Sequence, residues 1–411
     1  MTEEDADVLV VGGGPSGLAA AIELRRLGVG RVVVVEREDE AGGIPRHAAH
    51  PGFGLRDLHR VLDGPAYALR YARLAAHAGV EVCTGVTVNG WTGPTTVALT
   101  GAAGLTAVTA RATILATGCR ERPRSAHLVT GDRPPGVMTT GTLQQLVSLH
   151  RESPGRRAVV LGCEHVSFSA VLTLAHGRAT TVAMVTEHPR HQTWAPLCWF
   201  TAGRHGVPIL TNRRVTAIIG RRRVEAVAVT DTRTSHVERL ACDTVVFTGD
   251  WIPEHELART GGVAMDPATR GPRVDPSGRT SRPGVFAAGN LVHAAEPADV
   301  AALGGRRAAR AVRGYLESGQ WPRRAPLLVE CAPPVLWVSP SALDPETRGA
   351  DLILRVSAFV ERATLVVRQD ARVLWRRRYR RLVPNRSIRA AVRWSGELEP
   401  AGRAVTVALE E

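Results

Sequence analysis

The sequence predicts a three-layer α/β chain with two strand–turn–helix–strand units, one inserted within the other's domain, followed by an antiparallel β domain. Three observations support this fold class. A buried strand runs into a glycine-rich turn and a helix at the N-terminus. A similar succession occupies residues 157–187. After about residue 318 the chain changes to short β-rich segments broken by Pro, Gly and Asp.

The amino-acid composition excludes several kinds of functional site. The 411 residues carry a formal net charge of +13, and because the chain has no lysine, its 52 basic residues are all arginines. A Schiff-base lysine and a P-loop lysine are therefore excluded. The charge is spread along the chain, so we expect no nucleic-acid partner. The six cysteines are isolated, and no metal site is predicted.

The N-terminus is acidic and enters a strand almost at once. No signal peptide is recognised there, and no apolar run approaches the length needed to cross a membrane. We therefore expect a cytoplasmic protein without a membrane span.

The first unit reads "DVLVVGGGPSGLAAAIELRRLGVGRVVVVERE". Gly12, Gly14 and Gly17 fill the positions of a G-x-G-x-x-G turn, in which they allow a tight turn, close approach to a pyrophosphate and packing of helix on strand. The free N–H groups of the following helix favour the phosphates. Glu36 lies 24 residues beyond Gly12, where a carboxylate can accept hydrogen bonds from ribose hydroxyls. This pattern predicts a Rossmann-like dinucleotide-binding domain.

Two further stretches, "ILATGCRERP" at 114–123 and "RTSRPGVFAAGNLVH" at 279–293, resemble signatures of flavoproteins with two dinucleotide-binding domains. The resemblance implies that FAD is bound, without a covalent link. It also implies that Asn290, where aspartate is commoner, meets the pyrophosphate and ribitol. The helix in "ADVAALGGRRAARAV" would face the flavin with its N-terminal end.

Within that class, "GGIPRH" at 42–47, "ATGCRERPR" and the "GN" pair resemble the flavin subunits of opine oxidase, hydrogen cyanide synthase and the sarcosine oxidase alpha chain. The resemblance covers about residues 7–316. The motif and the resemblance together imply that the following residues contact FAD: Gly12, Gly14, Pro15, Ser16, Gly17, Glu36, Arg37, Gly43, Thr87, Ala116, Thr117, Gly118, Gly289, Asn290, Asp299 and Val300.

The second unit, "RAVVLGCEHVSFSA", departs from the glycine pattern. Glu164 and Ser167 stand where the second and third glycines are expected. A carboxylate at the first of these positions would repel a pyrophosphate, at a cost of roughly 4 kcal/mol for unit charges about 4 Å apart. We therefore doubt that NAD(P)H binds, although Gly162 and the helix N-terminus remain, and Glu164 could point away.

Neither cysteine arrangement of the disulfide reductases is present, neither Cys-x4-Cys after the glycine pair nor a CxxC in the inserted domain. We therefore expect a bound substrate, and not a dithiol, to reduce the flavin. A neutral histidine is a suitable base for such a reaction. The candidates are His47, His50 and His293, while Arg46 and Arg120 are candidates for binding a substrate carboxylate.

The expected domains are an FAD-binding part at 1–122, an inserted NAD(P)-binding-like domain at 123–245, the second FAD-binding part at 246–318 and a sandwich-like β domain at 319–411. In that last domain, we expect a hairpin near Asp370 and an arginine-rich edge strand in "LWRRRYRRLV".

We expect an FAD-dependent oxidoreductase that oxidises a C–N bond of a small amine or amino acid derivative by hydride transfer to flavin N5. Two alternatives stay open. One is an NAD(P)H-dependent flavin reductase or monooxygenase. The other is an FAD-binding subunit of a heteromeric oxidase, inactive alone, so the expected partners are a small-molecule substrate and either a partner subunit or further copies of the chain.

Overall fold

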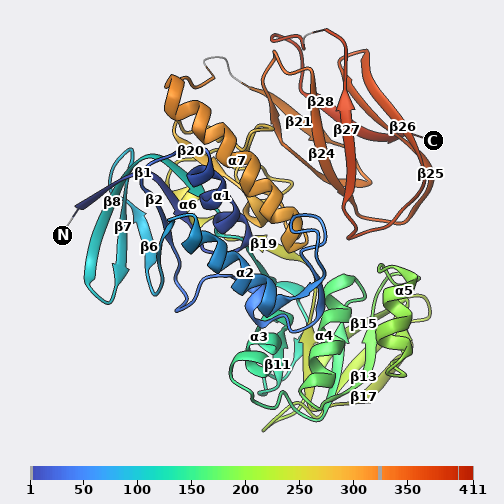
Figure 1. The fold of residues 1–411 in the computed structure, drawn as a ribbon. Coiled ribbons are helices and arrows are strands. Elements are labelled where there is room, and N and C mark those ends of the chain that lie inside the picture. Colours follow the sequence, from blue (N-terminus) through green and yellow to red (C-terminus); the bar gives the residue numbers. More distant parts are fainter. Residues whose placement is uncertain (1–2, 323–325, 397, 411) are drawn as a thin grey trace.

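The computed structural model describes residues 3–322, 326–396 and 398–410, arranged as two α/β regions and a β sandwich (Figure 1). The first α/β region is built on a seven-stranded sheet in the order β5-β2-β1-β8-β7-β6, with β20 paired to β8. Its strands are β1 (Glu3–Val11), β2 (Val32–Val35), β5 (Glu81–Cys83), β6 (Thr87–Trp91), β7 (Thr96–Gly101), β8 (Gly104–Leu115) and β20 (Val285–Ala287).

The central strands of this sheet are buried on both faces. β1 pairs in parallel with β2 and β8, and all four valines of β2 are buried. Val8 and Val10 of β1 pack in one hydrophobic cluster, whereas Leu9 and Val11 pack in a second. Because successive side chains of a strand point to opposite faces, this sheet needs a layer on each side, and the continuous apolar run predicts that arrangement.

Three helices are associated with this sheet: α1 (Pro15–Arg26), α2 (Gly64–His77) and α7 (Ala298–Ser318). α1 and α7 lie side by side (Figure 1). A Cβ added at Gly305 of α7 would lie 2.0 Å from the backbone oxygen of Ser16, so the two helices meet backbone to backbone. The smaller elements of this region are η1 (Ile44–His47), β3 (Pro51–Phe53), β4 (Leu62–Asp63), α6 (Glu256–Thr260) and η5 (Gly289–Leu291).

The second α/β region has a five-stranded parallel sheet in the order β11-β18-β12-β13-β14 and a four-stranded sheet in the order β10-β15-β16-β17. Its strands are β10 (Thr130–Gly131), β11 (Val137–Thr139), β12 (Arg157–Leu161), β13 (Thr180–Val185), β14 (Ile209–Leu210), β15 (Arg213–Ile219), β16 (Ala226–Asp231), β17 (Val237–Ala241) and β18 (Thr244–Phe247). Its helices are η2 (Arg124–His127), α3 (Thr140–Gln144), η3 (Gln145–Leu149), α4 (His165–His176), α5 (Ala195–Cys198) and η4 (Trp199–Gly203).

The chain passes between the two α/β regions at one place. β9 (Cys119–Glu121) leads into the second region and β19 (Trp251–Pro253) leads back, and these two strands pair antiparallel. The expected domain limit at residue 245 falls inside β18, which pairs with β12 in the second region. This pairing favours a limit between β18 and β19, while the domain limits themselves stay predictions.

The C-terminal region is a β domain of two sheets in the orders β23-β21-β28-β25-β26 and β22-β24-β27. Its strand pairs are antiparallel as expected, except that β21 pairs in parallel with β28. Its strands are β21 (Leu327–Cys331), β22 (Val335–Ser339), β23 (Ala342–Leu343), β24 (Gly349–Val356), β25 (Val360–Gln369), β26 (Arg372–Leu382), β27 (Ile388–Arg393) and β28 (Val405–Glu410). One apolar cluster fills the space between the sheets. β25 and β26 form the expected hairpin at Asp370, and β26 is the edge strand.

The sandwich contacts both α/β regions. Toward the second region, Arg190 pairs with Glu361 at 2.7 Å, and Arg386 donates hydrogen bonds to the backbone oxygens of Gln192 and Thr193. Toward the first region, it contacts Glu296 in the segment just before α7. The three parts are therefore connected by side chains as well as by the chain itself.

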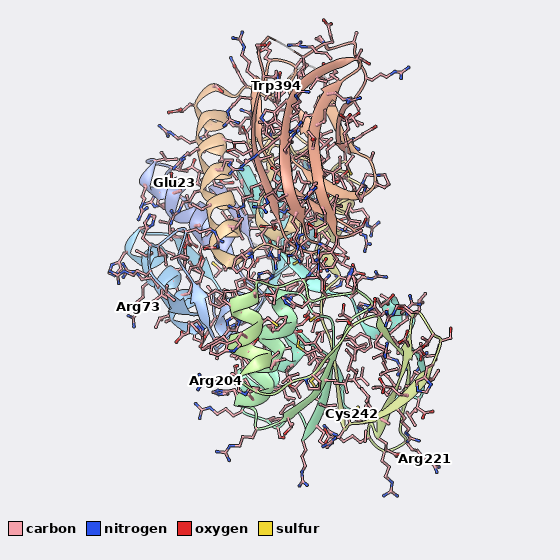
Figure 2. The ribbon with its side chains drawn as sticks, turned by 90° about the vertical axis from the view of Figure 1, so that its right-hand side faces the viewer. Glu23, Arg73, Arg204, Arg221, Cys242 and Trp394 are labelled. Atoms are coloured by element: carbon pink, nitrogen blue, oxygen red, sulfur yellow. The ribbon has the colours of Figure 1, made fainter. Side chains whose placement is uncertain are left out.

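Many arginines project outward, and Arg73, Arg204 and Arg221 lie at the periphery of the molecule (Figure 2). Across residues 3–322, 326–396 and 398–410, we find no helix both long and apolar enough to span a bilayer.

Candidate functional site

The turn between β1 and α1 is built by glycines that no other residue could replace without displacement. Gly12 has a φ of +107°, and a Cβ there would lie 2.5 Å from the backbone oxygen of Ala116. A Cβ on Gly17 would lie 1.9 Å from the backbone oxygen of Gly12. Since real Cβ atoms do not come this close, strand, turn and helix can pack in this way only with glycine at both positions.

The N-terminus of α1 is open for an anion. Gly14 precedes the helix, and no side chain of the described residues caps it. A Cβ at Gly14 would meet only the Cα of Gly43, at 3.9 Å, which leaves room above the helix end. The buried Oγ of Ser16 has no hydrogen-bond partner among the described residues. A dinucleotide pyrophosphate fits this helix end. It could accept hydrogen bonds from the free N–H groups and from the Ser16 hydroxyl, and Gly14 has no side chain to block it.

Glu36 stands at the end of β2 with its carboxylate turned to the glycine turn. Its Oε2 accepts a hydrogen bond from the backbone N–H of Gly13 at 2.8 Å, and its Oε1 accepts one from the backbone N–H of Glu38 at 2.9 Å. The side chain is buried and packs against Gly13. This is the place expected of a ribose-binding carboxylate.

The remaining residues expected to bind FAD are distributed unevenly. Ala116, Thr117 and Gly118 follow β8 directly, and the Thr117 hydroxyl donates to the backbone oxygen of Glu254. Pro15 is the first residue of α1, and Gly43 packs against Gly14. By contrast, Arg37 and Thr87 are exposed at the surface. Their contacts with FAD stay predictions.

The segment after β20 brings the second half of the site to the first. Gly289 has a φ of +71°, and a Cβ there would lie 2.7 Å from the Cβ of Ser16. Asn290 follows directly. Val300 and Asp299 lie in the first turn of α7, where Asp299 is buried and pairs with Arg56 at 3.0 Å. Two segments about 270 residues apart in sequence, at Ser16 and Gly289, thus lie against each other, while their joint binding of FAD stays a prediction.

His47 and His50 lie in the loop beside this site. His47 is buried, and burial lowers its pKa below the ordinary value, while the side chain of Gln144 from α3 opposes that shift. Its Nδ1 has no hydrogen-bond partner among the described residues. Burial also lowers the pKa of His50, whose Nδ1 lies 3.0 Å from the backbone oxygen of Pro51. Both rings are therefore neutral at pH 7 and can accept a proton.

His47 contacts the second α/β region, since Gln144 belongs to α3. A base at this position lies where the two regions meet.

Both candidate arginines already have carboxylate partners. Arg46 pairs with Glu40 at 3.0 Å and with Glu38 at 3.5 Å. Arg120 pairs with Glu254 at 2.6 Å and with Glu256 at 3.6 Å. A substrate carboxylate would have to compete with these groups for either guanidinium.

His293 contacts the C-terminal sandwich. Its ring stacks on Trp337 with a centroid distance of 5.2 Å, and burial lowers its pKa to about 4. A cavity of about 310 Å³ lies beside it, between α7 and strands β24 and β27. Of the residues expected at FAD, Gly289, Asn290 and Val300 line this cavity, whereas the glycine turn, Glu36 and the loop of His47 do not. His293 is thus held by a different part of the fold from His47 and His50.

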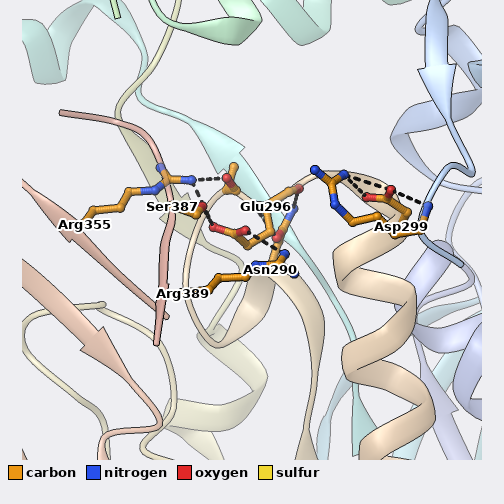
Figure 3. A network of polar contacts seen from close by, with 8 residues as sticks. Asn290, Glu296, Asp299, Arg355, Ser387 and Arg389 are labelled. Atoms are coloured by element: carbon orange, nitrogen blue, oxygen red, sulfur yellow. Dashed lines mark hydrogen bonds and ion pairs between the residues drawn. The ribbon is translucent and has the colours of Figure 1, made fainter. Parts of the chain in front are cut away.

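Arg355 is a residue of this area that the sequence did not reveal. Its side chain is 8% exposed, and its guanidinium donates to the backbone oxygen of Ala295 and pairs with Glu296 at 3.3 Å (Figure 3). The available signal was a charged residue between the buried Leu354 and Val356 of β24. That pattern indicates a buried arginine but does not name its partner.

The second turn has the backbone of the first but a different side chain at its centre. Glu164 occupies the position before α4 that Gly14 occupies before α1, with similar extended dihedral angles. Its Oε2 accepts hydrogen bonds from the backbone N–H of Ser167, at 3.2 Å, and from the Ser167 hydroxyl. Ser167 in turn lies 2.6 Å from the hydroxyl of Thr248. The carboxylate therefore caps the helix end to which a pyrophosphate would bind.

Burial raises the pKa of Glu164, although its hydrogen bonds with Ser167 favour the charged form. Its Oε1 lacks a hydrogen-bond partner among the described residues. The side chain points into the turn, so the arrangement in which it points away is not the one observed. Glu187, two residues after the end of β13, pairs with Arg214 at 2.6 Å.

All six cysteines are free, and the described residues contain no group of His, Cys, Asp and Glu that could hold a metal ion. Cys119 lies nearest in sequence to the expected flavin site. Burial raises its pKa to about 12, so it is a thiol at neutral pH.

Comparisons with known proteins agree with this geometry. The model of a family described as pyridine nucleotide-disulphide oxidoreductase matches residues 6–305. An opine oxidase subunit of Agrobacterium tumefaciens (strain Ach5) is 26% identical over 349 residues, which are 76% of this chain and 66% of that protein. The alpha subunit of sarcosine oxidase from Corynebacterium sp. (strain P-1) is 31% identical over 179 residues, which are 41% of this chain and 18% of that protein.

The matched region spans less than two thirds of the length of either relative. Among solved structures, T. acidophilum thioredoxin reductase is similar with a TM-score of 0.64 at 23% identity, covering 76% of this chain and 99% of that one. This likeness concerns the fold alone.

Proposed function

The chain belongs to the pyridine nucleotide-disulphide oxidoreductase family, and from this premise we propose that it oxidises a C–N bond in a small amine or amino acid derivative. Members of the family are oxidoreductases that bind FAD, and the open turn at Gly14 with Glu36 and Ser16 suits that cofactor. We further propose that the electrons that reduce the flavin come from this substrate.

The observation that carries the proposal is the cap formed by Glu164. A nicotinamide dinucleotide would have to displace a buried carboxyl group from the end of α4. If the carboxyl is charged it repels the pyrophosphate, and if it is protonated it still fills the space. The flavin is therefore reduced by a substrate bound beside it and not by NAD(P)H. This disfavours the NAD(P)H-dependent flavin reductase or monooxygenase.

His47 has the properties that the substrate reaction requires. The amine must be neutral when a hydride leaves the adjacent carbon, so a neutral base near the substrate accelerates the reaction. Burial lowers the pKa of His47, so its ring is neutral at pH 7, and its buried Nδ1 has no hydrogen-bond partner among the described residues. Bound FAD would supply the acceptor for the hydride.

The names of two relatives support the substrate class. Opine and sarcosine oxidases are named for substrates that contain a C–N bond. The six cysteines form no disulfide and are not paired in the two reductase patterns, so we infer that the chain is not a disulfide reductase.

A second candidate is favoured by the same two relatives, which are both named as subunits. The chain would then bind FAD within a heteromeric oxidase and need a partner for activity.

The test is anaerobic spectroscopy of the purified flavoprotein. NADH and NADPH are added first, then a panel of secondary amines that includes sarcosine. We expect bleaching of the flavin band by one amine and no change with either nicotinamide. Bleaching by NADH or NADPH within seconds would contradict the proposal. Bleaching by neither, together with a copurifying subunit, would favour the second candidate.

A matched pair of variants tests the base. His47→Gln should lower the rate of flavin reduction by about 100-fold, which is the smallest effect typical of removing a general base. His77→Gln, at an exposed position in α2, should leave the rate unchanged. Equal rates for both variants would remove His47 from the mechanism.

A further inference from the structure

The segment between η5 and α7 is held from outside the α/β fold. Glu296 lies in this segment, and its side chain is only 1% exposed. Three residues of the C-terminal sandwich contact its carboxylate (Figure 3). Arg355 lies at 3.3 Å from Oε1, Arg389 lies at 3.7 Å from Oε2, and the Ser387 hydroxyl donates a hydrogen bond to Oε1.

The same residue holds the side chain of Asn290 through its backbone. The N–H of Glu296 donates to Asn290 Oδ1 at 2.8 Å, and its carbonyl oxygen accepts from Asn290 Nδ2 at 3.1 Å. The amide of Asn290 is thus fixed by two hydrogen bonds to a single residue (Figure 3). A continuous polar connection runs from Arg355 and Arg389 through Glu296 to Asn290.

The charges make this connection strong. Arg355 is 8% exposed, so loss of the Glu296 charge would leave a buried guanidinium without its counter-ion. Breaking a buried pair by removing one partner is costly because the remaining charge is not solvated. The sandwich therefore supplies the counter-ions of the buried Glu296 carboxylate in this segment.

All three sandwich residues lie beyond residue 305, where the family match ends. The contact thus joins the C-terminal sandwich to the part of the chain that the family model matches.

We propose that Glu296 is a positioning residue, through which the C-terminal sandwich fixes Asn290 and so sets the affinity of the protein for FAD. The proposal rests on the placement of Asn290 beside FAD and not on the identity of the substrate. It assigns the sandwich a role in cofactor binding.

The test titrates FAD into the full-length protein from which FAD has been removed, following flavin fluorescence and the visible spectrum. Glu296→Gln keeps the size of the side chain and removes its charge, and we expect a dissociation constant for FAD at least tenfold higher. Asn290→Ala should weaken FAD binding as well. Because Glu296 acts through Asn290, the double variant should bind FAD no more weakly than Asn290→Ala alone.

The control is Glu361→Gln, the same change in an ion pair that joins the sandwich to the second α/β region, and it should leave FAD binding unchanged. An unchanged dissociation constant in Glu296→Gln overturns the proposal, as does a double variant in which the two effects multiply. No effect of Asn290→Ala overturns the proposal too, because the proposal requires Asn290 to lie at FAD. If Glu296→Gln does not fold, Ser387→Ala and Arg389→Gln, which remove single contacts, are tested in the same way.

Discussion

The imidazole of His293 makes the stability of the protein dependent on pH. Burial is the main cause of its lowered pKa of about 4. Glu296 raises the pKa, and three arginines lower it, namely Arg355, Arg389 and Arg307. The unfolded chain binds a proton near the ordinary value of 6.5, so between the two values the unfolded state holds more protons. The contribution of neutral His293 to the free energy of unfolding is therefore complete above about pH 6.5 and is lost as the pH falls toward 4.

We therefore expect the free energy of unfolding to fall on acidification, with His293 contributing up to roughly 2 kcal/mol between about pH 6.5 and 5. Urea denaturation followed by circular dichroism at both pH values measures it. His293→Gln should lose correspondingly less stability than the unchanged protein, and His77→Gln should behave like the unchanged protein. Equal losses of stability in the unchanged protein and in both variants would contradict the assignment of this pH dependence to His293.

Some residues of the site could be predicted from the sequence and others could not. Gly12, Gly17 and Glu36 could be placed because their roles depend on one strand, one turn and one helix in succession. The pairing of Arg355 with Glu296 joins residues 59 apart across two regions, and no local pattern fixes how those regions dock. The expected places of Arg37 and Thr87 at FAD stay predictions.

At the scale of elements, the two strand–turn–helix units of the α/β regions share a backbone and differ in what they can bind. Gly14 leaves the end of α1 open, whereas Glu164 satisfies the end of α4 from within. The sequence predicted both units because hydrophobic strand and helix patterns survive the loss of the glycines. It left open the direction of the Glu164 side chain, which depends on Ser167 and on Thr248 at the end of β18.

We expect Glu164→Gly to bind NADH at least tenfold more tightly than the unchanged protein, because the substitution frees the helix end and removes a carboxyl group from the phosphate position. Fluorescence titration with NADH measures the dissociation constants. Glu152→Gly, at an exposed position of the same region, should have no effect. Tight binding of NADH by the unchanged protein would refute this account of the turn.

For the whole molecule, the sandwich is tied to both α/β regions. It contacts the first through Glu296 and the second through Arg386 and the Arg190–Glu361 pair. Parts that share buried polar contacts unfold together when the coupling between them is strong. The arrangement follows from side chains that meet only in the folded state, so the sequence could predict each part but not their connection.

We therefore expect one transition in differential scanning calorimetry. A variant carrying Glu296→Gln and Arg386→Ala loses a contact to each α/β region, and in it the sandwich should unfold at a lower temperature as a separate transition. A variant carrying Arg204→Ala and Arg221→Ala, two exposed arginines, should retain the single transition (Figure 2). Two transitions in the unchanged protein would mean that the parts are independent.

The pairing of β20 with β8 has a consequence for synthesis. Thr113–Leu115 of β8 leave the ribosome well before Val285–Ala287, their partners, and 170 residues separate Leu115 from Val285. At about 5–20 residues per second, this interval lasts on the order of ten to thirty seconds. During that time the nascent chain has an unpaired strand edge at the centre of its first sheet and lacks Gly289 and Asn290. A site that includes Gly289 and Asn290 beside Ser16 can therefore form only after the inserted region has been translated.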